Sequence, residues 1–281
     1  MKKFGDNTIY SIETGRFALD GGAMFGTVPK VLWDKQIPSD TDNRIEMALR
    51  TLLIQTENRN ILIDTGMGHK WNDKQKAMYN LTNEKYTLHE SLKEIGLSES
   101  DVTDVILTHL HFDHAGGATK RDGNEMIPTF ENAQYYVQKK NYDWAINPNE
   151  RERASYLPEN FESLVNNKRL NFVEGNEEIF PGISVLTSDG HTIGMQCVKI
   201  SGGDTTVTYC ADLIPTSAHI PVPWIMGYDI QPLVILDEKK KFLKQAFEEN
   251  WILFFEHDPL TGSCRVAEGK KYFEKGESIL I

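Results

Sequence analysis

The chain has few cysteines and no long apolar run, and both absences exclude classes of protein. Its three cysteines, Cys197, Cys210 and Cys264, are widely spaced in 281 residues, which is no disulfide framework. We therefore expect small buried thiols in a reducing cytoplasm. No window of 18 apolar residues occurs, so no transmembrane helix and no membrane partner are expected.

A signal segment and a surplus of positive charge are also lacking. Lys2 and Lys3 resemble the start of a secretory signal, but no apolar stretch follows them, and we expect a cytoplasmic protein. Lys and Arg number 30 against 41 Asp and Glu, which gives a net charge of −11. Because phosphate binding depends on clustered Lys and Arg, this balance argues against a nucleic-acid partner.

What is present is an alternation of strand and helix patterns. The segment Thr87–Ile95 predicts a helix, since Thr87 and Glu90 have capping-box spacing and Gly96 ends it. Buried or half-buried strands are expected at Ala48–Thr56, Asn60–Asp64, Val105–Leu107, Gln134–Gln138, Ile183–Thr187, Thr205–Cys210 and Trp251–Phe255, the first two as a hairpin. Such alternation favours an α/β architecture in which helices cover sheets.

Two further segments bear on organisation. Asp237–Asn250 predicts a helix with Phe242, Ala246 and Phe247 facing inward. No Pro/Gly/Ser-rich linker divides the chain, so residues 1–281 are expected to form a single domain. Residues 139–169 are polar with interspersed aromatics, which predicts a helical excursion from the core. The pattern leaves open whether this excursion is a lid over a site or an inert insertion.

The most informative segment is ILTHLHFDHAGG, residues 106–117. It places His109, His111, Asp113 and His114 within six residues. In an extended loop, residues i and i+2 point the same way, so His109 and His111 can bind one metal ion. Asp113 and His114 diverge from that pair and suit a second ion, and imidazole with carboxylate fits zinc. Gly116 and Gly117 are expected to let the backbone turn tightly.

Three more potential ligands follow apolar strands. His191 lies in SDGHT, Asp212 in YCADL and His257 in FFEHD. Each is at the point where a strand candidate gives way to a loop, which is where α/β folds place their sites. Together with the His cluster they indicate a site for two metal ions.

These motifs resemble those of the metallo-β-lactamase superfamily, from Arg50 to Asp258. The resemblance implies an αββα sandwich of two mixed sheets with the metals at one edge. It also implies the ligands: His109, His111 and His191 for one ion, Asp113, His114 and His257 for the other, and Asp212 bridging both. Asp64, in NILIDTG with Gly66, resembles the first motif of that superfamily, and would orient ligands without binding metal.

Within the superfamily, the spacing is similar to that of the N-acyl-homoserine-lactone lactonases. Leu19–Trp33 and Asp212–Trp224 also resemble quorum-quenching lactonases, and the longer interval between His114 and His191 agrees with the excursion at 139–169. One position departs from the pattern. Compact lactonases have a Tyr three residues after the bridging Asp, where this chain has Pro215. Tyr228 and His219 are candidate replacements, unless the metal polarises the carbonyl alone.

The predicted function is therefore opening of an N-acyl homoserine lactone by a hydroxide that bridges two divalent ions, most simply Zn²⁺. Asp113 and Asp212 are the residues expected to take part in catalysis, with Asp113 or the second metal assisting the leaving alkoxide. The expected substrate pocket comprises Met24, Phe25, His219, Trp224, Met226 and Tyr228.

Two alternatives stay open at this point. The same site could hydrolyse another ester, such as an organophosphate triester or a thioester, because fold and site do not choose the substrate. An inactive metal-binding scaffold would lack at least one ligand, and none is missing. The sequence leaves open whether the protein is a monomer or a homodimer.

Overall fold

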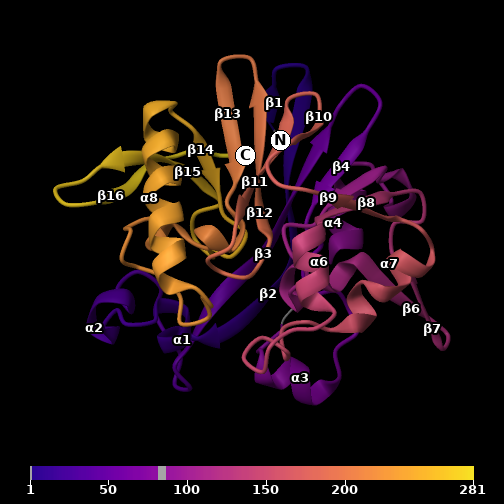
Figure 1. Ribbon diagram of the computed structural model, residues 1–281, viewed down its shortest axis with the longest axis horizontal. Helices are drawn as coiled ribbons and strands as arrows, with labels where there is room; N and C mark the ends of the chain where they lie inside the picture. Colours follow the sequence, from indigo (N-terminus) through magenta and orange to yellow (C-terminus); the bar gives the residue numbers. More distant parts are fainter. Residues whose placement is uncertain (1, 82–86) are drawn as a thin grey trace.

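The structure is a computed structural model that describes residues 2–81 and 87–281. Two seven-stranded mixed sheets pack face to face, with helices on their outer faces (Figure 1). This is the αββα sandwich that the sequence predicts. Among the described residues, no helix is long and apolar enough to cross a membrane.

Each sheet is formed by one half of the chain. The first sheet has the order β1-β2-β3-β4-β5-β8-β9 and comprises β1 (Lys2–Phe4), β2 (Asn7–Asp20), β3 (Arg44–Gln55), β4 (Asn60–Ile63), β5 (Asp104–Ile106), β8 (Gln134–Gln138) and β9 (Leu170–Val173). The second follows chain order with β10 (Glu178–Phe180), β11 (Ile183–Ser188), β12 (Met195–Gly202), β13 (Thr205–Tyr209), β14 (Ile252–Phe254), β15 (Ser263–Glu268) and β16 (Phe273–Ser278). A separate hairpin pairs β6 (Thr119–Asp122) with β7 (Glu125–Pro128).

The helices are divided between the two outer faces and one edge. The α-helices are α1 (Gly21–Phe25), α2 (Lys30–Trp33), α3 (Asp73–Met78), α4 (Leu88–Glu94), α5 (Phe112–Ala115), α6 (Lys139–Ala145), α7 (Glu162–Asn166) and α8 (Pro232–Glu248). Short 3₁₀ turns are η1 (Glu99–Asp101), η2 (Gly116–Ala118), η3 (Pro158–Asn160), η4 (Ala211–Leu213) and η5 (Ser217–His219). Helices α4, α6 and α7 cover the first sheet, and α8 covers the second.

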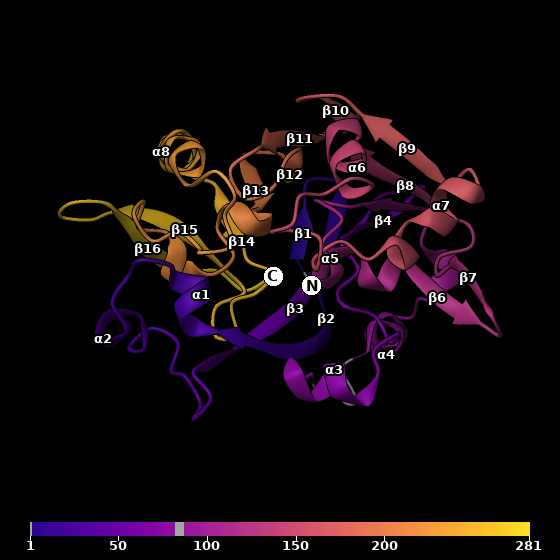
Figure 2. The same cartoon turned by 60° about the horizontal axis from the view of Figure 1, so that its bottom comes forward.

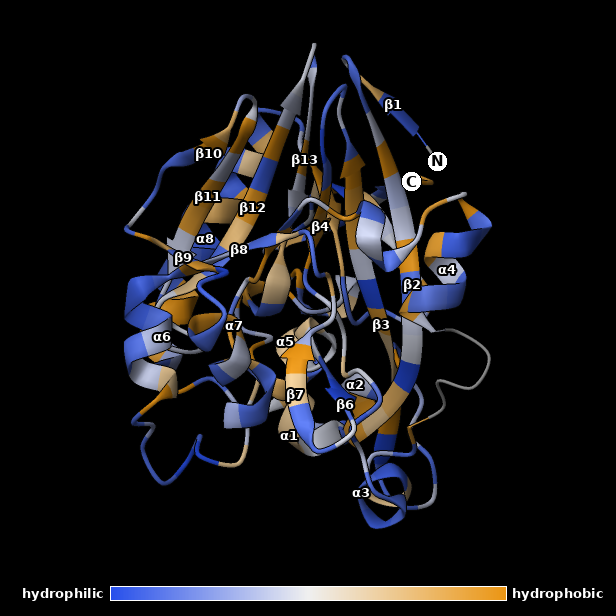
Figure 3. Ribbon diagram, turned by 90° about the vertical axis from the view of Figure 1, so that its right-hand side faces the viewer, coloured by the Kyte–Doolittle hydropathy of each residue, from blue (hydrophilic) through white to orange (hydrophobic). Residues whose placement is uncertain are grey.

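The strand period of two separates the core into layers. In β3, Leu52 and Ile54 belong to the core between the sheets, whereas Leu53 packs under the helices of the first sheet. Successive side chains of a strand point to opposite faces, so a sheet covered on both sides is apolar at consecutive positions. Figure 3 shows these apolar strands in the interior and polar helix faces outside.

Most expected elements are confirmed. The hairpin β3–β4 pairs antiparallel as predicted, and β8 has the predicted bounds. Thr87 caps α4 by accepting a hydrogen bond from Glu90 N at 3.1 Å. Nine of the described strands were not predicted from the sequence: β1, β2, β6, β7, β9, β10, β12, β15 and β16. The longest of them, β2, is interrupted by a bulge between Glu13 and Gly15.

Helix α8 corrects one prediction. It begins at Pro232, earlier than expected, and its inward positions include Phe242 and Ala246 but not Phe247, which is 40% exposed. The buried stripe instead includes Lys239. Its terminal nitrogen, Nζ, donates hydrogen bonds to the backbone carbonyls of His219, Pro221 and Trp224 at 2.6, 3.2 and 2.7 Å, so a buried lysine connects α8 to the loop beneath it.

Candidate metal centre

The site lies where parallel strands of both sheets end. Strands β4 and β5 run parallel, as do β13 and β14, and the carboxyl ends of parallel strands meet at one edge. Asp64 and His109 follow the first pair, and Asp212 and His257 follow the second. Figure 2 turns this edge forward, with α1 and α3 beside it.

The first group of ligand atoms consists of three imidazole nitrogens. His109 Nε2 lies 3.0 Å from His111 Nδ1, which lies 3.3 Å from His191 Nε2. All three side chains are buried. The structure thus brings together the three residues that the resemblance assigns to one ion.

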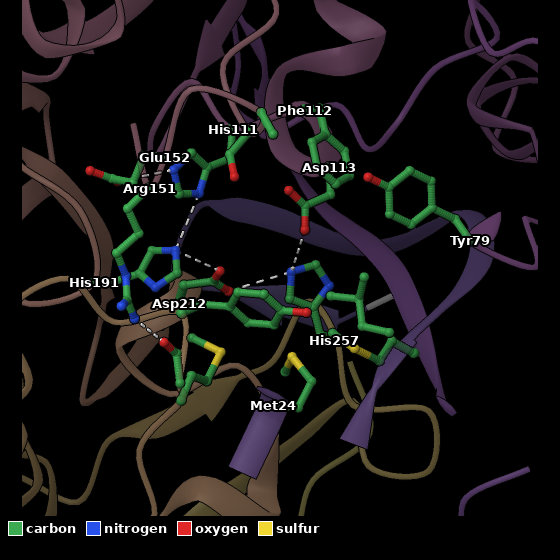
Figure 4. Close-up of a pocket in the computed structure, with 17 residues that line it drawn as sticks. Met24, Tyr79, His111, Phe112, Asp113, Arg151, Glu152, His191, Asp212 and His257 are labelled. Atoms are coloured by element: carbon green, nitrogen blue, oxygen red, sulfur yellow. Dashed lines mark hydrogen bonds and ion pairs between the residues drawn. The ribbon is translucent and has the colours of Figure 1, made fainter. Parts of the chain in front are cut away.

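The second group contains Asp113, His114 and His257. Its two imidazoles approach at 3.2 Å between their Nε2 atoms, and Asp113 Oδ2 lies 3.9 and 3.7 Å from them. Asp212 lies between the two groups, with Oδ2 3.1 Å from His191 Nε2 and Oδ1 3.4 Å from His257 Nε2. Asp212 is therefore placed to contact ions in both groups (Figure 4).

The outer nitrogens of four of these imidazoles have partners. His109 Nδ1 lies 3.0 Å from Thr108 Oγ1, and His257 Nδ1 lies 3.0 Å from the carbonyl oxygen of Ala48. His191 Nδ1 lies 3.0 Å from Asp229 Oδ1. His114 Nδ1 lies 3.0 Å from Asp64 Oδ2 and 2.8 Å from Glu256 Oε2.

These contacts test whether the residues fit metal ions. An imidazole whose outer nitrogen donates to a carboxylate or carbonyl presents a lone pair at its inner nitrogen, as metal-binding histidines do. Here the inner nitrogens converge on one another beside the carboxylates of Asp113 and Asp212. The lone pairs and the negative charges repel one another unless a cation lies between them. Asp212 Oδ1 is moreover buried without a hydrogen-bond partner among the described residues. The donor set fits two divalent ions.

The electrostatics of the site keep Asp212 charged and the imidazoles of His109 and His111 neutral. Burial acts to raise the pKa of Asp212, but His191, His114 and His257 outweigh it and hold that pKa well below its usual value. Burial lowers the pKa of His109 well below the ordinary value and also lowers that of His111. At His191 and His257, by contrast, the charge of Asp212 outweighs burial and raises the pKa values to about 10 and about 9, so a bound cation must displace those protons. Anionic carboxylate and neutral imidazole are the forms that bind metal.

Asp64 supports the site from behind. It has a left-handed backbone (φ 59°), which is uncommon for a residue with a side chain. Its carboxylate accepts hydrogen bonds from Thr108 N and Thr108 Oγ1, both at 2.7 Å, and contacts His114. This position agrees with the orienting role that the resemblance implies.

Sequence reasoning missed three carboxylates that contact the imidazoles: Glu152, Asp229 and Glu256. Glu256 also accepts a hydrogen bond from Tyr209 Oη at 2.5 Å, and burial raises its pKa to about 7. Its place beside His257 in FFEHD was a usable signal. Asp229 and Glu152 are distant in sequence from the residues they contact, and no spacing pattern marks them.

The two glycines after the His cluster serve a different purpose from the one expected. Neither has a positive φ. A Cβ atom on Gly116 would lie 2.3 Å from Met67 O, and one on Gly117 would lie 2.3 Å from Thr65 O. They are therefore needed for close approach of two backbones, not for a tight turn.

A cavity of about 470 Å³ opens over the site. Its polar lining includes His111, Asp113, His191, Asp212 and His257, and its apolar lining includes Leu19, Met24, Met47, Phe112 and Met226. Tyr79 and Tyr228 also line it.

Three of the six predicted pocket residues, Met24, Met226 and Tyr228, line this cavity. Phe25, His219 and Trp224 are not among its lining residues, because they pack against one another behind it. Phe25 stacks on His219 with ring centroids 4.5 Å apart and meets Trp224 edge-on. His219 contacts Thr216 Oγ1 through Nδ1 and Met24 O through Nε2, at 2.7 and 2.9 Å. With both nitrogens engaged, it cannot replace the Tyr that Pro215 displaces.

A two-metal donor set at the strand ends of an αββα sandwich defines a metal-dependent hydrolase. Residues 50–257 match the Metallo-beta-lactamase superfamily, and the chain belongs to that superfamily. It is 30% identical to an "N-acyl homoserine lactonase" of Bacillus thuringiensis over 76% of this chain and 83% of the relative.

Solved structures agree with this assignment. A "probable metal-dependent hydrolase" from Staphylococcus aureus superposes with a TM-score of 0.89 and 31% identity over 99% of this chain and all of its own. AidC, "a Dizinc Quorum-Quenching Lactonase" in complex with a product, superposes with a TM-score of 0.83 and 26% identity over 100% of this chain and 97% of its own.

Proposed function

We propose that the protein hydrolyses the lactone ring of N-acyl homoserine lactones with two zinc ions. One observation carries the proposal: five imidazoles and two carboxylates converge beneath a cavity whose lining also contains Leu19, three methionines and Phe112. A neutral lactone head with an acyl tail likewise has a polar and an apolar part. The activity of the relatives, given by their names, supports this substrate class.

The proposed ligands are those implied by the family resemblance. His109, His111 and His191 would hold one ion, Asp113, His114 and His257 the other, and Asp212 both. We propose zinc because imidazole and carboxylate donors suit it. Two such ions supply, when bound, a hydroxide nucleophile at neutral pH and positive charge for the carbonyl oxygen.

The chain's own residues bind and orient the substrate. Met24, Met47 and Met226 in the apolar lining of the cavity are flexible and polarizable, and such side chains adapt to a flexible acyl chain. Burying that chain directs the lactone carbonyl toward Asp212 and the imidazoles. Asp113 lines the cavity and is placed to handle the proton that the leaving ring oxygen acquires.

A hydroxyl donor for the substrate carbonyl is available despite Pro215. Tyr228 lines the cavity over the site, and partial desolvation within the cavity, with the negative charges of Asp20 and Asp113, raises its pKa to about 12. It therefore stays a neutral O–H donor at physiological pH. Of the two replacements that the sequence suggests, we propose Tyr228, because His219 lies behind the cavity.

The direct test is hydrolysis of N-decanoyl homoserine lactone by the zinc-loaded chain. Product acid is measured by chromatography, with a chelated aliquot and a Tyr228→Phe variant beside the wild type. We expect metal-dependent turnover, and a fall of roughly 10-fold or more in the variant, since one lost transition-state hydrogen bond costs at least that much.

Failure would take two forms. No lactone turnover by a chain that demonstrably holds two zinc ions would contradict the substrate, and phosphotriesters and thioesters would be assayed next. Full turnover after verified metal removal would contradict the metal mechanism. The cytoplasmic location, the absence of a nucleic-acid partner and the choice between monomer and homodimer stay predictions.

A further inference from the structure

Glu152 is a buried carboxylate outside the proposed ligand set. It lies between α6 and η3 and is 4% exposed. Two side chains donate hydrogen bonds to its oxygens. Thr192 donates its hydroxyl to Oε1 at 2.5 Å, and Trp144 donates its indole N–H to Oε2 at 2.7 Å. Burying a charged carboxylate is unfavourable unless it is well paired. A third group close to the Glu152 carboxylate therefore indicates what the residue does.

That neighbour is His111. Its Nδ1 faces His109 and His191, and its Nε2 faces Glu152 Oε1 at 3.5 Å (Figure 4). The distance is longer than a hydrogen bond, and His111 Nε2 is buried without a hydrogen-bond partner among the described residues. The other four imidazoles each have an outer partner within 3.0 Å.

We propose that Glu152 is the positioning residue of His111 and that residues 139–169 are thereby a fixed part of the metal centre. An imidazole that binds an ion through Nδ1 carries its proton on Nε2, and a buried N–H needs an acceptor. Glu152 Oε1 is the carboxylate oxygen that approaches this nitrogen, at 3.5 Å, and a small shift of either side chain would close the contact. The inference rests on the metal centre of the proposed function.

The surrounding contacts explain why the segment is fixed. Ser155 O accepts a hydrogen bond from Phe112 N at 2.9 Å, so the segment pairs with the metal-binding loop. Tyr156 packs on His111 with ring centroids 4.7 Å apart, and its hydroxyl lies 2.7 Å from Thr192 Oγ1. Thr192 directly follows His191, so Glu152 connects the loops that carry His111 and His191. The segment acts as a wall of the site, and neither a swinging lid nor an inert insertion describes it.

The test compares metal binding of Glu152→Ala and Glu150→Ala in the full chain. Glu150 is exposed in the same segment and is the matched control. Zinc affinity is measured by competition with a chromophoric chelator, and the Co²⁺-loaded proteins are compared by absorption spectra. We expect Glu152→Ala to bind one ion about 10–100-fold more weakly and the other normally, with an altered Co²⁺ spectrum. Glu150→Ala should match the wild type.

A conservative variant separates positioning from loss of the fold. Glu152→Gln keeps a carbonyl oxygen that can accept from His111 and should recover part of the lost affinity. Circular dichroism checks that each variant folds; if Glu152→Ala does not, Trp144→Phe, which removes one hydrogen bond to Glu152, carries the test. Unchanged affinity for both ions in the folded variant overturns the inference. A wild-type chain that cannot bind two ions overturns the proposed metal centre itself, a distinguishable result.

Discussion

Asp212 is the residue on which both halves of the site depend. Its carboxylate lies within 3.5 Å of His191, His114 and His257, and it is buried at the start of the loop after β13. The residue before it, Ala211, has a left-handed backbone (φ 47°), which costs about 1–2 kcal/mol for a residue with a Cβ. The surrounding structure must therefore hold this unfavourable backbone conformation, and the conformation orients the Asp212 carboxylate toward the three histidines.

Replacing Asp212 by Ala should reduce metal content as well as rate. Each ion loses a ligand and a balancing negative charge, so the fall in kcat/KM should exceed the roughly 10–100-fold that loss of an outer partner costs. Metal is counted by emission spectrometry on gel-filtered protein. Asp204→Ala, on an exposed turn, is the control, and a variant with two tightly held ions would refute the bridging role.

At the scale of elements, the loop after Asp212 depends on two buried basic side chains. Lys239 of α8 donates to three of its carbonyls, and His219 contacts Thr216 and Met24. Burial lowers the pKa of Lys239 to about 7 and that of His219 to about 4. His219 is therefore neutral in the folded protein at pH 7, where it can both donate and accept.

This geometry predicts a pH dependence of stability. The unfolded chain takes up a proton on His219 below about pH 6.5, whereas the folded protein resists protonation down to about pH 4. The unfolded state thus binds more protons in this window, and the free energy of unfolding falls as pH falls through it. Between pH 7 and pH 5, His219 should account for a loss of about 2 kcal/mol.

Urea unfolding of wild type and His219→Gln, at pH 7 and pH 5 in excess zinc, measures this loss. Gln keeps a donor for Met24 O but does not titrate. We expect the variant to be less stable at pH 7, because the stacking on Phe25 is lost, and yet to lose less stability on acidification. Equal pH dependence of the two proteins would show that His219 is not the group responsible.

At the scale of the whole molecule, the metal centre connects the two sheets. Its ligands come from loops of both halves of the chain, and Asp64, Asp113, Asp212 and Glu256 bring buried carboxylates together at one edge. Repulsion between buried charges of one sign opposes folding unless cations balance it. Bound metal should therefore stabilise the fold in addition to serving catalysis.

Metal removal should lower the melting temperature and abolish hydrolysis together. Ligand at about 100 times its Kd stabilises a protein by about 2.7 kcal/mol, which for a chain of this size corresponds to a shift on the order of 5 °C. Calorimetry of chelated and zinc-restored protein measures it. Zinc should shift Asp212→Ala less than wild type, and an identical melting temperature with and without metal would contradict a structural role.

How far the site could be predicted depended on where each residue lies in the sequence. His109, His111, Asp113 and His114 lie within six residues, in a loop and the helix α5 that follows it, so their joint chemistry is visible in the spacing alone. His191, Asp212 and His257 were found because each ends an apolar strand. Glu152 and Asp229 carry no such mark, because their contacts with His111 and His191 arise only when distant segments fold over the strand ends.

The residues of the pocket could likewise be predicted only in part. Met24 and Phe25 are neighbours in the sequence, yet Met24 lines the cavity and Phe25 packs behind it. Helix α8 shows the same limit, since an amphipathic pattern predicted the helix but placed Phe247 inside and did not anticipate buried Lys239. Whether a side chain is buried, exposed or facing the cavity depends on the neighbours that pack against it.

The sequence by itself therefore determined the α/β class, seven of the sixteen strands that the described residues form, and the residues proposed to bind metal, because strand periodicity and ligand spacing are local properties of the chain. Only the tertiary structure decided the partners of the imidazoles, the walls of the cavity and the contacts of residues 139–169. Those depend on contacts between segments far apart in the chain. Such contacts are set by the packing of two complete sheets and their helices, which no local pattern records.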